Sequence, residues 1–275
     1  MKTNTENIKR IMSENYQIDI SVFDNLFLLK TIEARISELS LRSGSEYLSY
    51  LKESTPESVS LRESLNNSYS EFFRPPLTFH MIEHLVLPKL FNRREYEKSG
   101  DIRIWSAGCA AGQEPYSLAI LTEDYRAANH KENKIRVFGT DRNQKELSTA
   151  SKGIYHFKSV QNTKLYYIST YFSNSGEFYS INSVIKDIVD FSLFDLLGED
   201  SGSPPSSIYG DFEIVMCSNL LFYYNPEIQK KIVSRLTESL EHEGFLITGE
   251  AEVELIKSYS GLKQLSSLVP IFVKT

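Results

Sequence analysis

The stretch RIWSAGCAAGQEPYSLAI, residues 103–120, joins a short apolar segment to a helical one through a bend of small residues. A bend rich in glycine and alanine lets the backbone approach a ligand, because a larger substituent on Cβ would block that approach. An acidic residue, Glu114, stands where the helical segment begins. The stretch therefore predicts a ligand-binding turn between a strand and a helix.

Strands and helices alternate along the chain from Ile102 to about residue 252. Apolar segments typical of strands cover 102–108, 135–141, 212–219 and 244–252, and helical patterns cover 114–128, 143–155 and 225–244. Such alternation predicts an α/β fold, a parallel sheet with helices on both faces. Residues 164–189, rich in Tyr, Phe, Ser and Asn, interrupt the alternation and predict a small antiparallel insert.

The first seventy residues show helical periodicity and no strand pattern. Residues 21–41 place apolar side chains three and four positions apart, which predicts one apolar stripe of Phe23, Leu26, Leu29, Ile32, Ile36 and Leu39. Two shorter helices are expected at 45–53 and 58–67, separated by Pro56. We therefore expect a small helical domain before the α/β domain.

Composition narrows the classes of function. The 275 residues carry a net charge of −6, which argues against a broad surface for nucleic acid or an anionic membrane. Cys109 and Cys217 lie in apolar segments and predict free thiols in a reducing cytosol. His80 and His84 are four residues apart but lack an HExxH motif, so we expect no metal. The N-terminus has no signal-peptide core, and no apolar run reaches membrane-spanning length.

Two acids follow successive predicted strands, where ligands of open α/β sheets bind. Glu114 follows the glycine bend and can meet an amine, and Asp141 ends the next strand, where a carboxylate can accept hydrogen bonds from ribose hydroxyls. Taken singly, Gly108 and Gly112 can be ordinary turn residues and Asp141 a helix cap. Together they favour a ligand site. Neither a GxGxxG fingerprint nor a Walker loop is present, so the pattern indicates a nucleoside without a phosphate requirement, such as S-adenosylmethionine.

Four segments resemble successive motifs of the chemotaxis receptor methyltransferase (CheR) family. They are FFRPP (72–76), SAGCAAGQEPYSLAI (106–120), GTDRNQKELSTASKGIY (139–155) and the segment from IVMCSNLLFYYNP to GEAE (214–252). The resemblance implies a helical N-terminal domain at 1–70, a doubly wound, Rossmann-like methyltransferase domain at 71–275, and a β-subdomain inserted at about 162–188. It also implies methyl transfer from S-adenosylmethionine to glutamate side chains of chemoreceptors, giving glutamate methyl esters and S-adenosylhomocysteine in chemotaxis adaptation.

The resemblance implies roles for individual residues. Arg74 and Tyr223 match the catalytic residues of the family. The positions matching its cofactor-binding residues are Ser68, Ser70, Arg74, Gly108, Glu114, Asp141, Asp195, Leu196, Asn219 and Leu220. The implied partners are the cytoplasmic domains of membrane chemoreceptors. We expect a cytoplasmic monomer that binds no nucleic acid and no metal and does not insert into the membrane.

The chemistry implied by the resemblance suits the residues present. A glutamate side chain has a pKa near ~4.3 and is ionised at neutral pH, so its methylation needs no general base. No Ser-His-Asp pattern and no activated cysteine is evident in the sequence. Arg74 can grip a carboxylate with two parallel hydrogen bonds.

Several positions differ from the family pattern and leave the protein substrate open. These are Ser68, Gln113, Asp195 and Ser218, and the second helix carries Lys30, Arg35 and Arg42 in place of an arginine cluster. One alternative is an enzyme of the same fold acting on another signalling protein. The other is a degenerate member that binds a nucleoside or a partner without turnover.

Overall fold

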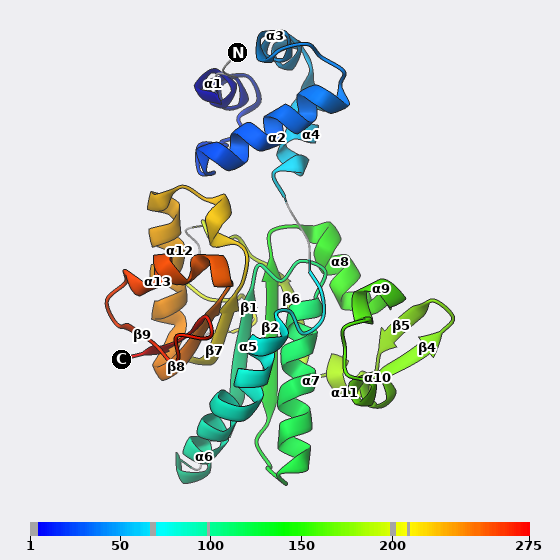
Figure 1. Ribbon diagram of the computed structural model, residues 1–275, viewed down its shortest axis with the longest axis vertical. Coiled ribbons are helices and arrows are strands. Elements are labelled where there is room, and N and C mark those ends of the chain that lie inside the picture. The colour runs from blue at the N-terminus through cyan, green and yellow to red at the C-terminus, as the bar shows by residue number, and fades with distance from the viewer. Residues whose placement is uncertain (1–4, 67–69, 98–99, 199–201, 208–209) are drawn as a thin grey trace. The chain divides into compact units, whose positions relative to one another are not determined.

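The computed structural model describes residues 5–66, 70–97, 100–198, 202–207 and 210–275 and divides into two compact units (Figure 1). The first unit contains residues 1–67 together with the later segment Leu221–Lys230. The second contains Ser68–Leu220 and Lys231–Thr275. Ser68 lies outside the described residues.

The first unit is helical. Its N-terminal helices are α1 (Thr5–Tyr16), α2 (Asn25–Glu38), α3 (Gly44–Glu53) and α4 (Thr55–Ser64). The side chains of Asp24, Ser43 and Ser54 accept backbone N–H hydrogen bonds at the starts of α2, α3 and α4, so each of these helices begins at a capping residue.

The predicted apolar stripe of α2 is wrong in one position. Leu26 is 60% exposed, whereas Leu28 and Ile32 are fully buried. Phe23, which precedes the helix, is also buried. The buried face of α2 therefore runs through Leu28 rather than Leu26.

A buried ion pair joins α2 to α4 in this unit. Arg35 donates from Nε to Oε1 of Glu57 (3.0 Å) and from Nη2 to Oε2 (2.5 Å), and the Tyr47 hydroxyl donates to Oε1 (2.8 Å). Glu57 is only 3% exposed. Burial, followed by the hydrogen bond to Glu57, raises the pKa of Tyr47 well above its usual value, so the tyrosine stays a donor.

The second unit is built on a seven-stranded sheet. Its strands are β1 (Ile102–Ala107), β2 (Ile135–Asp141), β6 (Val189–Leu193), β7 (Phe212–Cys217), β8 (Leu240–Thr248), β9 (Leu262–Gln264) and β10 (Ile271–Lys274). They lie in the order β6-β2-β1-β7-β8-β10-β9, and only the pairs that involve β10 are antiparallel. The strand order reverses between β1 and β7, which confirms the α/β prediction and creates a switch point there.

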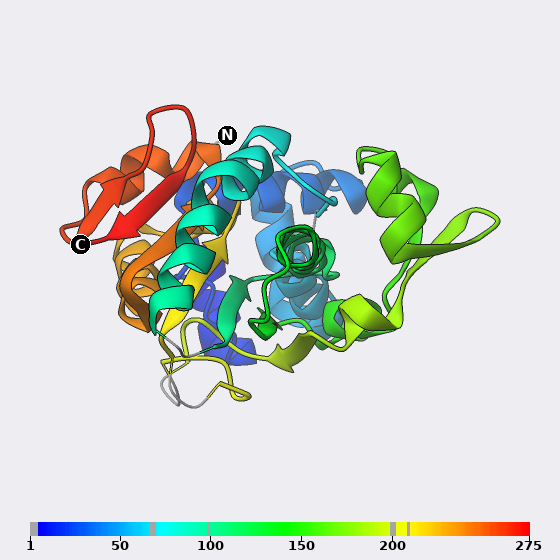
Figure 2. The same ribbon diagram turned by 90° about the horizontal axis from the view of Figure 1, so that it is seen from below.

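Helices pack along this sheet (Figure 2). They are α5 (Pro76–Met81), the π-turn η1 (Ile82–Val86), α6 (Leu87–Glu97), α7 (Gln113–Ala128), α8 (Gln144–Lys152), α12 (Pro226–Ser239) and α13 (Val253–Lys257). Helix α7 contacts β1, β2 and β6, and α8 contacts β2 and β6. Strand β1 is buried along almost its whole length, and the Trp105 indole N–H donates to the Thr140 hydroxyl (2.9 Å).

A small antiparallel sheet of order β3-β5-β4 is present, as expected. It consists of β3 (Ile154–His156), β4 (Phe172–Ser175) and β5 (Phe178–Ile181), accompanied by the short helices α9 (Phe157–Val160), α10 (Leu165–Tyr171) and α11 (Ser183–Lys186). Two details differ from the sequence interpretation: β3 was expected to be the end of a helix, and residues 165–171 are helical rather than extended.

Among the described residues, no helix is long and apolar enough to cross a membrane.

The buried ion pair predicts a local stability effect. Glu57→Gln removes the charge that faces Arg35 and should lower the stability of the first unit by about 3 kcal/mol, because it leaves a guanidinium without its buried counter-charge. Amide hydrogen exchange of α2 and α4 in increasing urea measures this. Glu38→Gln is the control, because Glu38 also pairs with Arg35 but its side chain is 62% exposed, so a loss below 1 kcal/mol is expected. Equal effects of the two substitutions would contradict the assignment.

Candidate functional site

The bend between β1 and α7 is built from residues with left-handed backbone conformations. Gly108, Ala110 and Gly112 have φ of 77°, 47° and 91°. A Cβ on Gly112 would lie 2.7 Å from Cβ of Ala150, and one on Gly108 would lie 3.1 Å from Cδ2 of Leu220. Neighbouring elements therefore come close enough to the bend that these two positions require glycine.

The Asp141 carboxylate ties this bend to the end of β2. Its Oδ2 accepts a hydrogen bond from the Ala110 N–H (2.9 Å), and its Oδ1 accepts one from the Asn143 N–H (2.8 Å). The cap of α8 is Asn143, whose side chain accepts from the Lys145 N–H, so Asp141 does not cap that helix. Each carboxylate oxygen can accept a second hydrogen bond, which leaves Asp141 able to bind a ligand.

The Glu114 carboxylate lies in the first turn of α7, beside the end of β1. The Ser106 hydroxyl donates to its Oε1 (2.7 Å). Burial raises the pKa of Glu114 to about 7, the Ser106 hydrogen bond lowers it, and the charge of Glu252 raises it. A carboxylate held in such a place gains most from a cationic ligand, because the cation restores the electrostatic stabilisation lost with water.

The end of β7 forms the next wall of the site. Asn219 adopts a left-handed conformation (φ 59°), and the side chain of Leu220 lies against Gly108. The backbone N–H groups of Asn219 and Leu220 donate to the carboxylate of Glu252, at 3.3 and 2.8 Å. Residues from β1, β2 and β7 thus meet at the carboxyl edge of the sheet.

Asp195 and Leu196 follow β6 at the same edge. The Phe194 N–H donates to the Asp141 carbonyl (3.0 Å), which places the segment directly beyond the end of β2. The Asp195 side chain accepts from the Leu197 N–H (2.9 Å), and Arg235 donates to the Leu196 carbonyl (2.6 Å). Asp195 therefore shapes its own turn.

The FFRPP segment is fixed to α7 through its backbone. The Phe73 N–H donates to the Ser117 hydroxyl (2.9 Å), and Ser117 lies one helical turn beyond Glu114. Phe72 packs edge-on against Tyr155 and Phe172 of the small sheet, with ring centroids 4.9 and 5.3 Å apart. Arg74 is exposed, and Ser70 is half-buried. The buried phenylalanines therefore anchor a segment whose arginine faces solvent.

Tyr223 lies in the short 3-10 turn η2 (Leu221–Tyr223), within the segment that belongs to the first unit. Its ring packs against Phe27, with centroids 4.7 Å apart, and its carbonyl accepts from the Asp24 N–H (2.8 Å). Tyr224 stacks on Phe23. The α2 end of the helical unit thus fixes this turn, which begins one residue after Leu220.

Both cysteines are buried free thiols, and burial raises the pKa of each well above its usual value. Neither is therefore poised as a nucleophile.

Some of the site could not be found from the residue patterns. Glu252, Ser106 and Ser117 act through hydrogen bonds to backbone or to other side chains, and single polar residues near strand ends carry no sequence signature for this. The one available signal for Glu252 is the acidic pair in GEAE, directly after the β8 strand.

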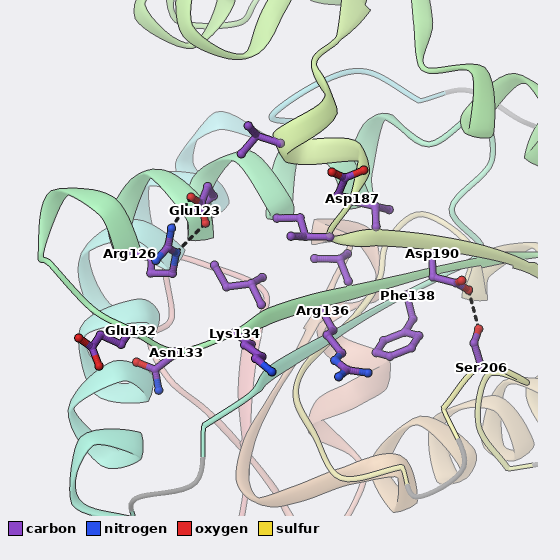
Figure 3. Close-up of a pocket in the computed structure, with 15 residues that line it drawn as sticks. Glu123, Arg126, Glu132, Asn133, Lys134, Arg136, Phe138, Asp187, Asp190 and Ser206 are labelled. Carbon is purple, nitrogen blue, oxygen red and sulfur yellow. Dashed lines mark hydrogen bonds and ion pairs between the residues drawn. The ribbon is translucent and has the colours of Figure 1, made fainter.

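A pocket of about 700 Å³ lies elsewhere, against the starts of β2 and β6 (Figure 3). Acidic and basic side chains both line its walls. Glu123 forms an ion pair with Arg126, and the Ser206 hydroxyl donates a hydrogen bond to Asp190. None of the predicted site residues lines it. The pocket lies at the opposite edge of the sheet from the switch point.

His80, Glu83 and His84 bring their donor atoms within 4.8 Å of one another on α5 and η1. The two histidines are exposed, and the Glu83 carboxylate pairs with Lys164 (3.0 Å). The carboxylate of this cluster therefore already has a cationic partner.

Comparisons with known proteins show which family the chain resembles over most of its length. Residues 68–267 match the family model described as "CheR methyltransferase, SAM binding domain". The chain is 24% identical to a chemotaxis protein methyltransferase of Borreliella burgdorferi, covering 96% of this chain and 91% of that one. It is 26% identical to a Listeria monocytogenes protein of the same name, covering 97% and 95%. It is 27% identical to a "probable biofilm formation methyltransferase WspC" of Pseudomonas aeruginosa, covering 92% and 58%.

The hydrogen bond between Ser106 and Glu114 predicts a measurable shift. Ser106→Ala removes a donor that favours the ionised carboxylate, so the pKa of Glu114 should rise above its value of about 7. Carbon-13 NMR titration of side-chain carboxyls measures it. Ser151→Ala, an exposed position on α8, should leave the titration unchanged. A Glu114 pKa that stays the same or falls in Ser106→Ala would contradict the assigned contact.

Proposed function

We propose that this chain, which belongs to the CheR methyltransferase family, transfers a methyl group from S-adenosylmethionine to glutamate side chains of chemoreceptors. The observation that carries the proposal is the pair of carboxylates, Glu114 and Asp141, on either side of the glycine bend at the switch point of the sheet. Together they supply one acid for an ammonium group and one for two hydroxyls.

The residues present fit S-adenosylmethionine. The free acceptor sites of Asp141 suit the vicinal hydroxyls of a ribose, and the raised pKa of Glu114 suits a partner that restores its charge, such as the amino group of the methionine part. Leu220 provides an apolar wall against Gly108 for the adenine or methionine part. Ser70, Asn219, Asp195 and Leu196 are proposed to complete the site, as the family resemblance implies, and Ser68 is retained on that ground alone.

The proposed chemistry places few demands on proton transfer. S-adenosylmethionine, when bound, supplies an electrophilic methyl group on its sulfonium. The substrate glutamate is already ionised at neutral pH, so the task of the protein is to position it and remove its water. We assign the gripping of the substrate carboxylate to Arg74, whose guanidinium can form two parallel hydrogen bonds. Tyr223 is assigned to orientation at the reacting centre.

The substrate could instead be another signalling protein. Of the three basic residues that the second helix offers in place of an arginine cluster, Arg35 is engaged by Glu57 and is largely buried. Lys30 and the trailing Arg42 are exposed. One relative also carries a name that refers to biofilm formation. A degenerate, non-catalytic binding module is less well supported, because Glu114, Asp141, Arg74 and Tyr223 are all retained.

The remaining expectations follow from this substrate. An enzyme acting on the cytoplasmic part of receptors works in the cytoplasm, and we propose that it acts as a monomer without a metal. S-adenosylhomocysteine is the second product.

The first test concerns the cofactor. Asp141→Ala removes a charge-assisted pair of hydrogen bonds and should weaken S-adenosylhomocysteine binding by roughly 2–3 kcal/mol. Calorimetric titration measures the affinity, and circular dichroism checks the fold. Asp190→Asn, at the start of β6, is the control and should bind as wild type does. Unchanged affinity in a folded Asp141→Ala variant would remove Asp141 from the site.

The second test concerns the substrate carboxylate. Arg74→Lys keeps the charge but loses the two-pronged geometry, so methyl transfer to receptor-enriched membranes should slow by about 2–4 kcal/mol of activation free energy. Single-turnover rates at saturating S-adenosylmethionine measure this. Arg136→Lys, an exposed arginine near the start of β2, should leave the rate unchanged. A lysine variant at position 74 as fast as wild type would mean a different carboxylate-binding group.

A further inference from the structure

The Glu252 carboxylate is a buried acid with no part in the proposed reaction. It lies in the 3-10 turn η3 (Glu250–Glu252), directly after β8, and is 1% exposed. Burial of an ionisable group is costly unless hydrogen bonds compensate for the lost water. The hydrogen-bond donors around Glu252 therefore indicate its structural role.

Three backbone N–H groups donate to this carboxylate. Leu220 donates to Oε1 (2.8 Å), Gly249 to Oε2 (2.7 Å) and Asn219 to Oε2 (3.3 Å). Two of these donors lie in the segment that follows β7, and the third directly follows β8. Glu252 therefore joins two neighbouring strand ends at the carboxyl edge of the sheet.

The backbone around Glu252 is shaped to allow this. A Cβ on Gly249 would lie 3.0 Å from the Asn219 nitrogen and 3.0 Å from Oε2 of Glu252, so the approach requires a residue without a side chain. Asn219 adopts its left-handed conformation at the same place. Such conformations persist where surrounding contacts determine them, and the bonds to Glu252 are the described contacts that do so.

Leu220 links the hydrogen bonds of Glu252 to the glycine bend after β1. The Leu220 N–H is bound to Glu252, and the Leu220 side chain lies on Gly108. Moving the Leu220 backbone would therefore move the apolar wall of the site against the bend.

We propose that Glu252 is a positioning residue for the cofactor, holding the Asn219–Leu220 backbone in its binding conformation. The inference depends on the proposed function, because it takes S-adenosylmethionine as the ligand of this site.

The charge of Glu252 affects the pKa of Glu114, which can be measured. Burial is the main reason that the pKa of Glu114 is raised to about 7, and Glu252 raises it as well. The Ser106 hydroxyl and the thiols of Cys109 and Cys217 also interact with Glu114, and Asp141 and Glu146 act on the Cys109 thiol. Because burial raises the pKa of both thiols well above its usual value, the thiols stay neutral near neutral pH. Among the described residues, Glu252 is thus the negative charge that raises the pKa of Glu114.

Loss of the Glu252 charge should move the pH midpoint of ligand binding downward. Glu114 binds an ammonium group in its ionised form, so affinity falls as the pH drops through the pKa of Glu114 in the free protein. Removing the negative charge of Glu252 lowers that pKa, so the loss of affinity moves to lower pH. A purely structural role of Glu252 would weaken binding without moving this midpoint.

The test is calorimetric titration with S-adenosylhomocysteine from pH 5.5 to 8.5. In Glu252→Gln, the amide nitrogen cannot accept a hydrogen bond, so we expect affinity at pH 8 to fall about tenfold or more and the acid midpoint to move down. Glu250→Gln is the matched control, because Glu250 lies in the same turn but is exposed. It should bind within about twofold of wild type, with an unmoved midpoint.

The outcomes separate this inference from the proposed function. Failure of the wild-type protein to bind S-adenosylhomocysteine would overturn the proposed function. A folded Glu252→Gln variant with wild-type affinity and midpoint would overturn the role of Glu252 alone. If Glu252→Gln does not fold, Glu252→Asp decides, because it keeps the charge and shortens the side chain. It should bind several-fold more weakly with an unmoved midpoint, and wild-type affinity would contradict the inference.

Discussion

The hydrogen bond from the Ala110 N–H to the Asp141 carboxylate fixes the carboxyl edge of the sheet, where the candidate site lies. It joins the bend after β1 to the end of β2 over 2.9 Å. Ala110 can make it because the bend turns through left-handed conformations at Gly108, Ala110 and Gly112. For alanine this conformation is unfavourable, and such local strain concentrates at functional sites where neighbouring structure enforces it.

Other parts of the site follow from that constraint. With the bend held against β2, Gly108 presents a surface on which Leu220 lies, and α7 begins where Glu114 meets Ser106. Phe73 is then fixed by Ser117 of the same helix, which brings the FFRPP segment to α7. The Gly108, Glu114, Asp141 and Leu220 positions of the candidate site thus lie at strand ends and in the first turn of α7.

Much of the α/β architecture could be predicted from local patterns. Strands β1, β2 and β7 are apolar runs with polar or glycine boundaries, and the CheR resemblance is confirmed by a family match over residues 68–267. Helix α10 was missed because its Tyr, Ile and Thr residues are typical of strands, and tertiary packing overrides that preference. Leu26 was misplaced because three- and four-residue spacings fit two adjacent faces of α2, and only packing selects between them. Glu252 was missed because backbone donors leave no trace in the sequence.

The proposed product is a glutamate methyl ester, so the decisive measurement identifies the bond that the methyl group forms. The protein is incubated with S-adenosylmethionine labelled in its methyl group and with receptor-enriched membranes, and the labelled proteins are separated by size and treated with mild alkali. The account predicts label in a receptor-sized band that is released as volatile methanol, because carboxyl esters hydrolyse in alkali. Label that survives alkali would show methylation of nitrogen or of an ether oxygen and would contradict the account.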